Sequence, residues 1–372
     1  MNISDMIPKK RKKKIGIILF SNLRYSPYLK FYTDAISKLK DAEYKVIYFD
    51  RYKDLNEKMD EQFLPVSWIG NKGNNSSKVL KFVNFQRFKR KAAAIINREN
   101  FDFLIVVPTM PSILLANILS SKYAGRYISD VRDYTYEHVK SFFKTETKVL
   151  KNAAVRVISS PGFRTFLPEM EYHVCHNIVG GYDAPVSINN QTQPIVISYI
   201  GSIGYLEQCK RLIDLVSSDS RFEFHFYGND ATGIITDYVN ELHCNRVLMK
   251  GAFMPNDKPY IYERSNLVFN CYGNDRPLVK YAISNKYYDG ALYRRPLLVS
   301  PNTIMQEISG DYAYALDLET ANDLNDLFDW YHSLDVNMYD AFASDVVQRS
   351  LQENKQTEEA ILRAIMDAHE AK

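Results

Sequence analysis

The chain has 372 residues, of which 46% are hydrophobic and 24% charged, with 14 prolines and 15 glycines. This composition is typical of a folded protein with two domains or one large one, and it excludes a peptide hormone, a disulfide-stapled miniprotein and a coiled rod. The net charge is +3, but residues 1–14 alone carry six basic side chains and one acidic side chain. The rest of the chain is therefore slightly acidic, which argues against a nucleic-acid-binding protein.

The first half of the chain alternates short β-rich apolar runs with longer helical patterns, which is typical of a parallel α/β sheet. The predicted strands are 14–20, 44–50, 103–107, 126–130, 155–160 and 172–177, and the predicted helices are 27–40, 79–97, 112–122 and 136–152. Residues 103–121 contain no charge, but Pro108 and Pro111 interrupt them. We therefore expect a buried strand, a turn and a buried helix there, and not a membrane span.

A break follows at Gly180, Gly181, Pro185 and the polar run 189–194, which we interpret as a linker. After it the alternation restarts, with predicted strands at 195–200, 222–227, 247–250, 266–272, 296–300 and 314–318, and helices near 207–217, 232–242, 258–263 and 286–293. From Asn337 the pattern is helical to the end.

The alternation predicts an α/β chain with two doubly wound, parallel-sheet domains. We expect a basic tail (1–13), a first Rossmann-like domain (14–185), a second one (186–339) and C-terminal helices (340–372).

Four predicted strands of the second domain are each followed by a glycine: Gly201, Gly228, Gly251 and Gly273. Ligands bind at the carboxyl ends of parallel strands, where helix N-termini present N–H groups to anions, and glycine lets the backbone approach a ligand closely. Each glycine alone could merely relieve a tight turn, but the set favours a ligand site. No dinucleotide fingerprint or P-loop occurs, which argues against a dehydrogenase and a P-loop ATPase.

The segment 284–299 carries the strongest motif. Ser284 or Asn285 caps a predicted helix, Lys286 and Asp289 lie three residues apart on it, and the run 294–296 (Arg-Arg-Pro) stops it before a strand. This segment resembles the donor-binding signature of the GT-B glycosyltransferases, especially the family 4-like (group 1) enzymes of surface and capsular polysaccharide biosynthesis. The resemblance extends to 199–201, 225–228, 250–251 and 266–269, and more loosely to 128–133 and 159–163.

The resemblance implies a GT-B fold, in which two Rossmann-like domains face a central cleft and the last helix crosses back to the first domain. It implies that Asp289 bonds the ribose of a nucleotide-sugar, since a carboxylate can accept two hydrogen bonds from vicinal hydroxyls. It also implies that Lys286 and its helix N-terminus hold the diphosphate. An exposed ion pair between Lys286 and Asp289 is the alternative. The donor-site positions that the resemblance implies are Gly201, Ser202, Gly228, Lys250, Gly251, Ala252, Gly273, Asn274, Asn285, Lys286 and Asp289.

The sequence also departs from the family pattern. No Glu stands upstream of Asp289 to complete the family's E-x7-E pair, and the Arg and Lys that usually clamp the phosphates are replaced by Ser202 and Glu207. No D-x-D triplet occurs, so we expect no metal ion in the reaction.

On the acceptor side, Asp133 is the candidate for orienting the acceptor hydroxyl or taking its proton, and His138 is a weaker candidate. A buried ion pair between Asp133 and Arg132 is the alternative. Asn22 and Arg24, in the loop after the first strand, occupy the position of the family's acceptor-side loop.

Residues 78–98 contain seven basic and no acidic side chains, with apolar residues between them. This pattern resembles an interfacial amphipathic helix, which together with residues 8–14 could dock on an anionic membrane beside a lipid-linked acceptor. A solvated helix with a buried aromatic stripe is an equally good interpretation. The four cysteines, Cys175, Cys209, Cys244 and Cys271, are scattered as in a reduced protein, and no secretory signal is visible, so we expect a cytoplasmic location, peripheral to the inner face of the membrane if the docking holds.

The resemblance implies a hexosyl-type glycosyltransferase (EC 2.4) that moves a sugar from a UDP- or GDP-sugar to an acceptor hydroxyl. It further implies retention of the anomeric configuration, and polysaccharide or lipid-linked oligosaccharide assembly as the setting. Two alternatives stay open: a GT-B-type sugar-nucleotide epimerase, and a non-catalytic, membrane-binding scaffold of the same fold.

Overall fold

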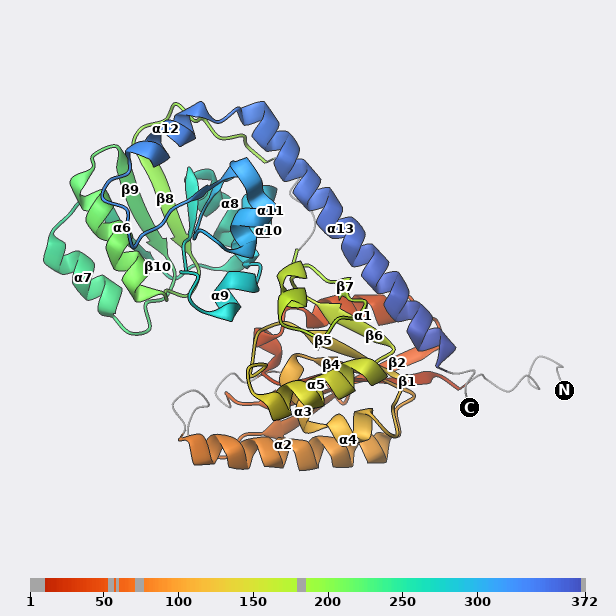
Figure 1. The fold of residues 1–372 in the computed structure, drawn as a ribbon. Coiled ribbons are helices and arrows are strands. Elements are labelled where there is room, and N and C mark those ends of the chain that lie inside the picture. Colours follow the sequence, from red (N-terminus) through yellow and green to blue (C-terminus); the bar gives the residue numbers. More distant parts are fainter. Residues whose placement is uncertain (1–10, 53–56, 58–59, 71–76, 179–184, 369–372) are drawn as a thin grey trace. The chain divides into compact units, whose positions relative to one another are not determined.

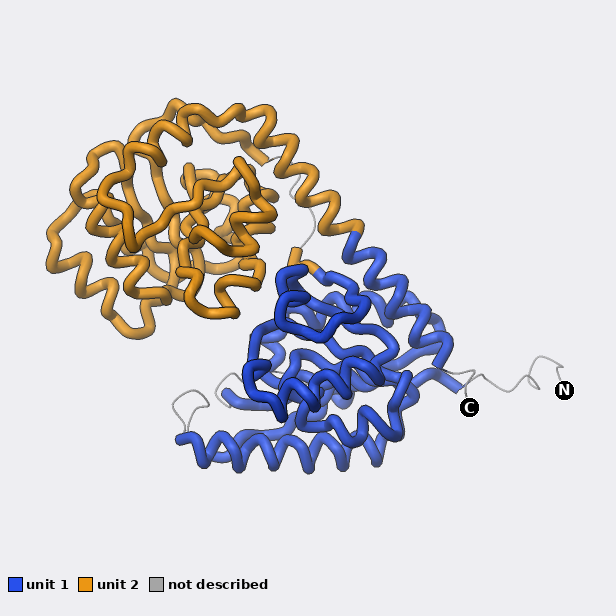
Figure 2. Tube along the Cα trace, in the orientation of Figure 1, with its two compact units in different colours: residues 1–175, 353–372 blue, residues 176–352 orange. Residues whose placement is uncertain are grey.

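The computed structural model describes residues 11–52, 57, 60–70, 77–178 and 185–368 (Figure 1). The chain divides into two compact units, one of residues 1–175 with 353–372 and the other of residues 176–352 (Figure 2). The predicted basic tail up to residue 10 and the linker glycines Gly180 and Gly181 lie outside the described residues.

The first unit is built on a seven-stranded parallel sheet with the order β3-β2-β1-β4-β5-β6-β7. Its strands are β1 (Lys13–Leu19), β2 (Ala42–Asp50), β3 (Phe63–Ser67), β4 (Phe103–Val107), β5 (Tyr127–Val131), β6 (Val155–Ile158) and β7 (His173–Val174). Its helices are α1 (Leu29–Ser37), α2 (Lys78–Glu99), α3 (Thr109–Leu114), α4 (Ala116–Leu119) and α5 (Lys140–Asn152). The strand order reverses between β1 and β4, as in a doubly wound sheet.

Both faces of this sheet are buried, which explains why its strands read as continuous apolar runs. Neighbouring residues of β1 enter different cores: Ile17 packs with Tyr32 of α1, and Ile18 packs with Phe88 of α2. The core that holds Ile17 also contains Ile361 and Ile365 from the last helix.

The second unit is built on a six-stranded parallel sheet with the order β10-β9-β8-β11-β12-β13. Its strands are β8 (Ile195–Ile200), β9 (Phe222–Tyr227), β10 (Val247–Gly251), β11 (Leu267–Asn270), β12 (Leu297–Val299) and β13 (Ala313–Ala315). Its helices are α6 (Leu206–Ser218), α7 (Ile234–Leu242), α8 (Lys258–Glu263), α9 (Pro277–Tyr281), α10 (Asn285–Leu292), α11 (Ile304–Ser309) and α12 (Asn325–Ser333). Here the order reverses between β8 and β11.

The last helix, α13 (Val336–Asp367), belongs to both units. Tyr339 and Val346 from its first part lie in the core of the second unit. Its last part packs in the first unit, where Glu358 forms an ion pair with Lys38 and the carbonyl of Ile365 accepts a hydrogen bond from Lys13 Nζ (2.8 Å). The predicted return of the C-terminal helix to the first domain is therefore confirmed.

The predicted fold class, two doubly wound parallel sheets, is confirmed. The prediction missed the edge strand β3, because Pro65 within it is a residue that usually argues against a strand. It also missed the short helices α9 and α11 and the helix α12. In residues 103–121 the predicted buried strand is β4, but the single helix predicted over 112–122 is divided into α3 and α4, and α3 begins at Thr109 where a turn was expected. None of the helices in the described part of the chain has both the length and the apolar character needed to cross a bilayer.

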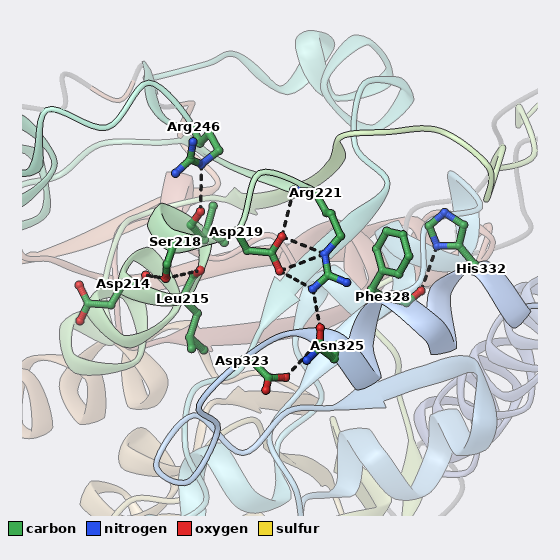
Figure 3. A network of polar contacts seen from close by, with 11 residues as sticks. Asp214, Leu215, Ser218, Asp219, Arg221, Arg246, Asp323, Asn325, Phe328 and His332 are labelled. Carbon is green, nitrogen blue, oxygen red and sulfur yellow. Dashed lines mark hydrogen bonds and ion pairs between the residues drawn. The ribbon is translucent and has the colours of Figure 1, made fainter.

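One polar network stabilises the amino-terminal edge of the second sheet (Figure 3). Arg221, directly before β9, donates to both carboxylate oxygens of Asp219 (2.9 and 2.6 Å) and to Asn325 Oδ1 of α12 (2.8 Å). Its guanidinium carbon lies 4.6 Å from the ring centroid of Phe328. The network joins the start of β9 to α12, at the opposite end of the strands from the glycines that follow them.

Candidate functional site

The strand order reverses between β8 and β11. At such a switch point the connections after the two strands run in opposite directions, and ligands bind between them at the carboxyl ends of the strands. Gly201 directly follows β8, and Gly273 follows β11 three residues after its end. Gly228 and Gly251 lie at the same edge of the sheet, at the ends of β9 and β10. The structure therefore brings the predicted glycines to one edge of the second sheet.

The glycine loops contact one another through their backbones. Gly201 N donates to Tyr227 O (2.8 Å), and Gly228 N donates to Gly251 O (2.8 Å). A Cβ at Gly228 would lie only 1.7 Å from the carbonyl oxygen of Gly201, so no larger residue fits there. Glycine is therefore required at position 228 by the close approach of two loops. At positions 201 and 251 glycine is favoured by the backbone, whose φ angles are positive, 130° and 79°.

Lys286 lies in the first turn of α10, and its partly buried side chain places the amino group beside the loop after β8. Its Nζ donates a hydrogen bond to Tyr272 Oη and lies 4.9 Å from the ring centroid of Tyr199. A Cβ on Gly201 would be 3.8 Å from this Nζ. Burial lowers the pKa of Lys286 to about 8, and the nearby Asp289 opposes the shift. The site thus contains a desolvated cation at the switch point of the sheet, an arrangement suited to an anionic ligand.

Asp289 lies one turn further along α10, and its ion pair is with Lys258 of α8. Asp289 Oδ2 accepts hydrogen bonds from Lys258 Nζ (2.7 Å) and from Tyr262 Oη (3.1 Å). The side chains of Asp289 and Lys258 are 17% and 32% exposed. The exposed Lys286–Asp289 pair considered above is therefore not the arrangement found.

The remaining donor-side candidates are spread along the same edge. Ser284 caps α10, its Oγ accepting from Lys286 N (3.2 Å). Asn285 is exposed, and its Oδ1 accepts from Asn177 Nδ2 (2.7 Å). The Nδ2 of Asn274 donates to Pro301 O (2.9 Å). The other candidates are exposed at the ends of β8 and β10: Ser202, Lys250, Gly251 and Ala252. Lys250 and Ala252 lie at the end of β10, which is two strands away from β8, whereas Lys286 of α10 lies beside the loop after β8.

In the first unit, Asp133 follows β5 and does not form the ion pair with Arg132 that was considered as the alternative. Arg132 pairs instead with the buried Asp130 (2.7 Å), which also accepts from Tyr32 Oη (2.7 Å). Desolvation raises the pKa of Asp133 to about 6, while Arg132 lowers it. Because this pKa lies below 7 and the Asp133 side chain is exposed to solvent, Asp133 is a carboxylate at neutral pH.

The other acceptor-side candidates differ in how free their side chains are. Asn22 is buried and fully used: its Oδ1 accepts from the N–H groups of Arg51 (2.9 Å) and Tyr52 (3.0 Å), and its Nδ2 donates to Asp50 (2.9 Å). It fixes the loops after β1 and β2 to each other. Arg24 and His138 are exposed, and His138 Nδ1 lies 3.2 Å from the hydroxyl of Tyr134.

The sequence reasoning missed Tyr199, Tyr272, Lys258 and Tyr262 as parts of this site. The tyrosines looked like ordinary core residues, because nothing in a single sequence shows that they surround a lysine. Lys258 and Tyr262 did carry a signal, since they are four residues apart in a correctly predicted helix and therefore share a face.

Neither a protein-family model nor a curated protein sequence matches the chain. Solved structures do resemble it. Sucrose-phosphate synthase from Thermosynechococcus elongatus matches with a TM-score of 0.67 and 10% identity, over 97% of this chain and 100% of that one.

Anabaena HepE in complex with UDP and glucose matches with a TM-score of 0.60 and 15% identity, over 94% of this chain and 99% of that one. A UDP-N-acetylglucosamine 2-epimerase matches with a TM-score of 0.54 and 10% identity, over 90% and 91%. At such identities the likeness concerns the fold: the chain has the GT-B fold, which these glycosyltransferases and epimerases share.

Proposed function

We propose that the protein is a glycosyltransferase that moves a sugar from a nucleotide diphosphate-sugar to an acceptor hydroxyl. The observation that carries this proposal is the partly buried Lys286 at the start of α10, beside Gly201 at the switch point of the second sheet. The solved structure of HepE, which has the same fold, holds UDP and glucose, and this supports a nucleotide-sugar as the donor.

In this proposal the donor lies along the glycine edge of the second sheet. The diphosphate binds the Lys286 ammonium at the first turn of α10, where the helix dipole favours negative charge. Asp289 accepts hydrogen bonds from the ribose hydroxyls, and the backbone at Gly251 and Ala252 faces the base. Asn274 lies near the donor sugar.

The reaction breaks the bond between the anomeric carbon and the diphosphate oxygen, which keeps the electron pair, and forms a bond from the acceptor oxygen to that carbon. Lys286 stabilises the negative charge that grows on the leaving diphosphate. The acceptor proton goes to the leaving phosphate if the configuration is retained, and Asp133 orients the acceptor hydroxyl. Since Ser202 and Glu207 replace the usual basic clamp, Lys286 carries more of this stabilisation than a clamped site would require.

The setting that we propose is a membrane surface that supplies a lipid-linked or surface-polysaccharide acceptor. Support comes from α2, where Phe88, Ala92 and Ile96 are buried but the first turns expose Val79 (73%) and Phe82 (63%). Exposed apolar side chains next to basic ones suit the interface of an anionic bilayer. A cytoplasmic protein docked on the inner face of the membrane fits this arrangement.

The test of the function is binding and turnover of nucleotide-sugars by the full chain. We expect UDP or GDP to bind in calorimetry, and one member of a panel of nucleotide-sugars to raise the melting temperature and be consumed with an acceptor. If neither nucleotide binds, the scaffold alternative replaces the enzyme.

An epimerase is the second candidate, because an epimerase shares the fold. Incubation with the donor alone separates the two functions, since an epimerase converts the nucleotide-sugar without an acceptor. A new nucleotide-sugar formed under these conditions would contradict the transferase.

A further inference from the structure

The two carboxylate oxygens of Asp289 have different surroundings. Oδ2 accepts a charge-assisted hydrogen bond from Lys258 Nζ at 2.7 Å and a second bond from Tyr262 Oη at 3.1 Å. Oδ1 accepts no hydrogen bond from any residue in the described part of the chain. Since each carboxylate oxygen has two lone pairs, Oδ2 is fully used and Oδ1 is open.

The donors to Oδ2 come from a helix that is held firmly against the end of α10. Arg295, which is 3% exposed, donates to the carbonyls of Tyr262 (2.7 Å) and Glu263 (3.3 Å) at the end of α8. The ring of Tyr262 stacks on Tyr293, with centroids 4.4 Å apart and an interplanar angle of 12°. Tyr293 directly follows α10 and Arg295 lies two residues further on, so these contacts hold Lys258 and Asp289 in a fixed relation.

These contacts determine which part of Asp289 a ligand can meet. A carboxylate with one oxygen held by an ammonium and a phenol cannot rotate freely. A ribose diol that reaches Asp289 therefore meets Oδ1 alone, whose two lone pairs match two vicinal hydroxyls.

We propose that Lys258 is a positioning residue of the donor site, which, with the help of Tyr262, fixes Asp289 so that Oδ1 selects a ribonucleoside diphosphate over its 2′-deoxy analogue. This inference rests on the proposed function, because it takes Asp289 as the ribose-binding residue. It adds a residue and a selectivity for which the proposed function gives no account.

The test compares the dissociation constants of UDP and 2′-deoxy-UDP, or of GDP and 2′-deoxy-GDP if GDP is the nucleotide that binds. The wild-type chain should prefer the ribonucleotide about ten-fold, the effect of one hydrogen bond to a charged group. Lys258→Met should weaken the ribonucleotide, which bonds Oδ1 through two hydroxyls, about ten-fold more than the deoxynucleotide, which keeps only the 3′-hydroxyl, so that the preference disappears. A merely structural role for Lys258 would instead weaken both nucleotides equally.

Two further variants show whether Lys258 acts through Asp289. Tyr262→Phe keeps the stacked ring and removes one donor to Oδ2, so it should reduce the preference in the same direction but less. In an Asp289→Asn background, Lys258→Met should have no further effect on the preference. Lys258→Arg keeps the positive charge, so this variant should retain part of the preference for the ribonucleotide that Lys258→Met loses.

Arg264→Met is the matched control, because Arg264 ends the same helix but stacks on Tyr260 (3.5 Å) and does not contact Asp289. It should leave the preference intact. If the wild-type chain binds neither UDP nor GDP, the proposed function fails and this inference fails with it. If the wild type binds and discriminates, and Lys258→Met and Tyr262→Phe discriminate equally well, only the inference is overturned.

Discussion

Lys286 shows how a binding residue can cost the free protein stability. Its charged form is disfavoured by burial, and this lowers its pKa to about 8 from 10.5. A structural lysine would be expected at the surface, whereas this one is surrounded by Tyr199 and Tyr272. We interpret the unfavourable burial as preorganisation for an anion that restores the charge balance.

The prediction for Lys286 concerns the pH dependence of stability. Between pH 8 and 10.5 the unfolded state holds the proton that the folded state has lost, so the free energy of unfolding should rise with pH in this window. Lys286→Met should be more stable than the wild type below pH 8, by roughly 2–3 kcal/mol, and should bind the nucleotide far more weakly. Urea denaturation at pH 7 to 10.5 measures the effect, and parallel pH profiles of the two proteins would contradict it.

The neighbours of Arg132 show both the reach and the limit of sequence reasoning at this scale. In an extended chain, residues two apart share a face, so Arg132, which directly follows β5, meets Asp130 and not the adjacent Asp133. The alternation of side chains along an extended chain therefore predicts the Arg132–Asp130 ion pair and argues against an Arg132–Asp133 pair. By contrast, the partner of Asp289 is 31 residues away on α8, and only tertiary packing reveals it.

At the scale of elements, the loops after β8 and β9 approach each other closely, and this contact requires a glycine at position 228. Gly228→Ala would place a Cβ 1.7 Å from Gly201 O, which forces the backbone to shift. We expect a loss of about 3 kcal/mol in the free energy of unfolding. Gly204→Ala is the matched control in the same loop region, since no atom lies within 4 Å of its Cβ, and it should change stability by less than about 1 kcal/mol. Equal effects in denaturation would disprove the close contact.

The network around Arg221 joins β9 to α12 at the amino-terminal end of the strands, far along them from the candidate site (Figure 3). Hydrogen bonding from Arg221 lowers the pKa of Asp219, so the pair should stabilise the fold above the ordinary pKa of an aspartate and lose this effect as the pH falls through the lowered value. Both side chains are partly exposed, and Arg221→Met should therefore cost only about 1 kcal/mol near neutral pH. Nucleotide affinity should not change, and calorimetry of the variant checks this.

For the whole molecule, the sequence predicted the two parallel sheets and the helix and strand of segment 284–299, because hydrophobic periodicity and turn residues are local signals. The donor-binding role of that segment stays a prediction. The sequence did not predict β3, whose Pro65 masks the strand pattern at the sheet edge. Nor did it predict which lysine faces which carboxylate, since Lys258 and Asp289 meet only after α8 and α10 pack together. The local structure of the candidate site could thus be predicted from the sequence, whereas the side chains that pack around Lys286 and Asp289 could not.

The membrane proposal is also a prediction about the whole molecule. The full chain should bind vesicles rich in phosphatidylglycerol but not pure phosphatidylcholine vesicles, and binding should weaken as salt screens the basic residues of α2. Phe82→Asp should reduce sedimentation with the vesicles about ten-fold, because it removes an exposed apolar contact. Ala94→Asp makes the same charge change at another exposed position of α2 and should have a smaller effect. If the wild-type chain fails to sediment, α2 is an ordinary solvated helix.

The helix α13 has a consequence for how the chain is made. The core around β1 is built from residues near the amino terminus, yet Ile361 and Ile365 complete it. On a ribosome, the unit that is translated first therefore stays unfinished until Ile365 has emerged, well after the second unit has been made, although domains of large proteins usually fold in the order of their synthesis. The second unit can assemble in the meantime, and the nascent first sheet must avoid aggregation for the whole of that interval.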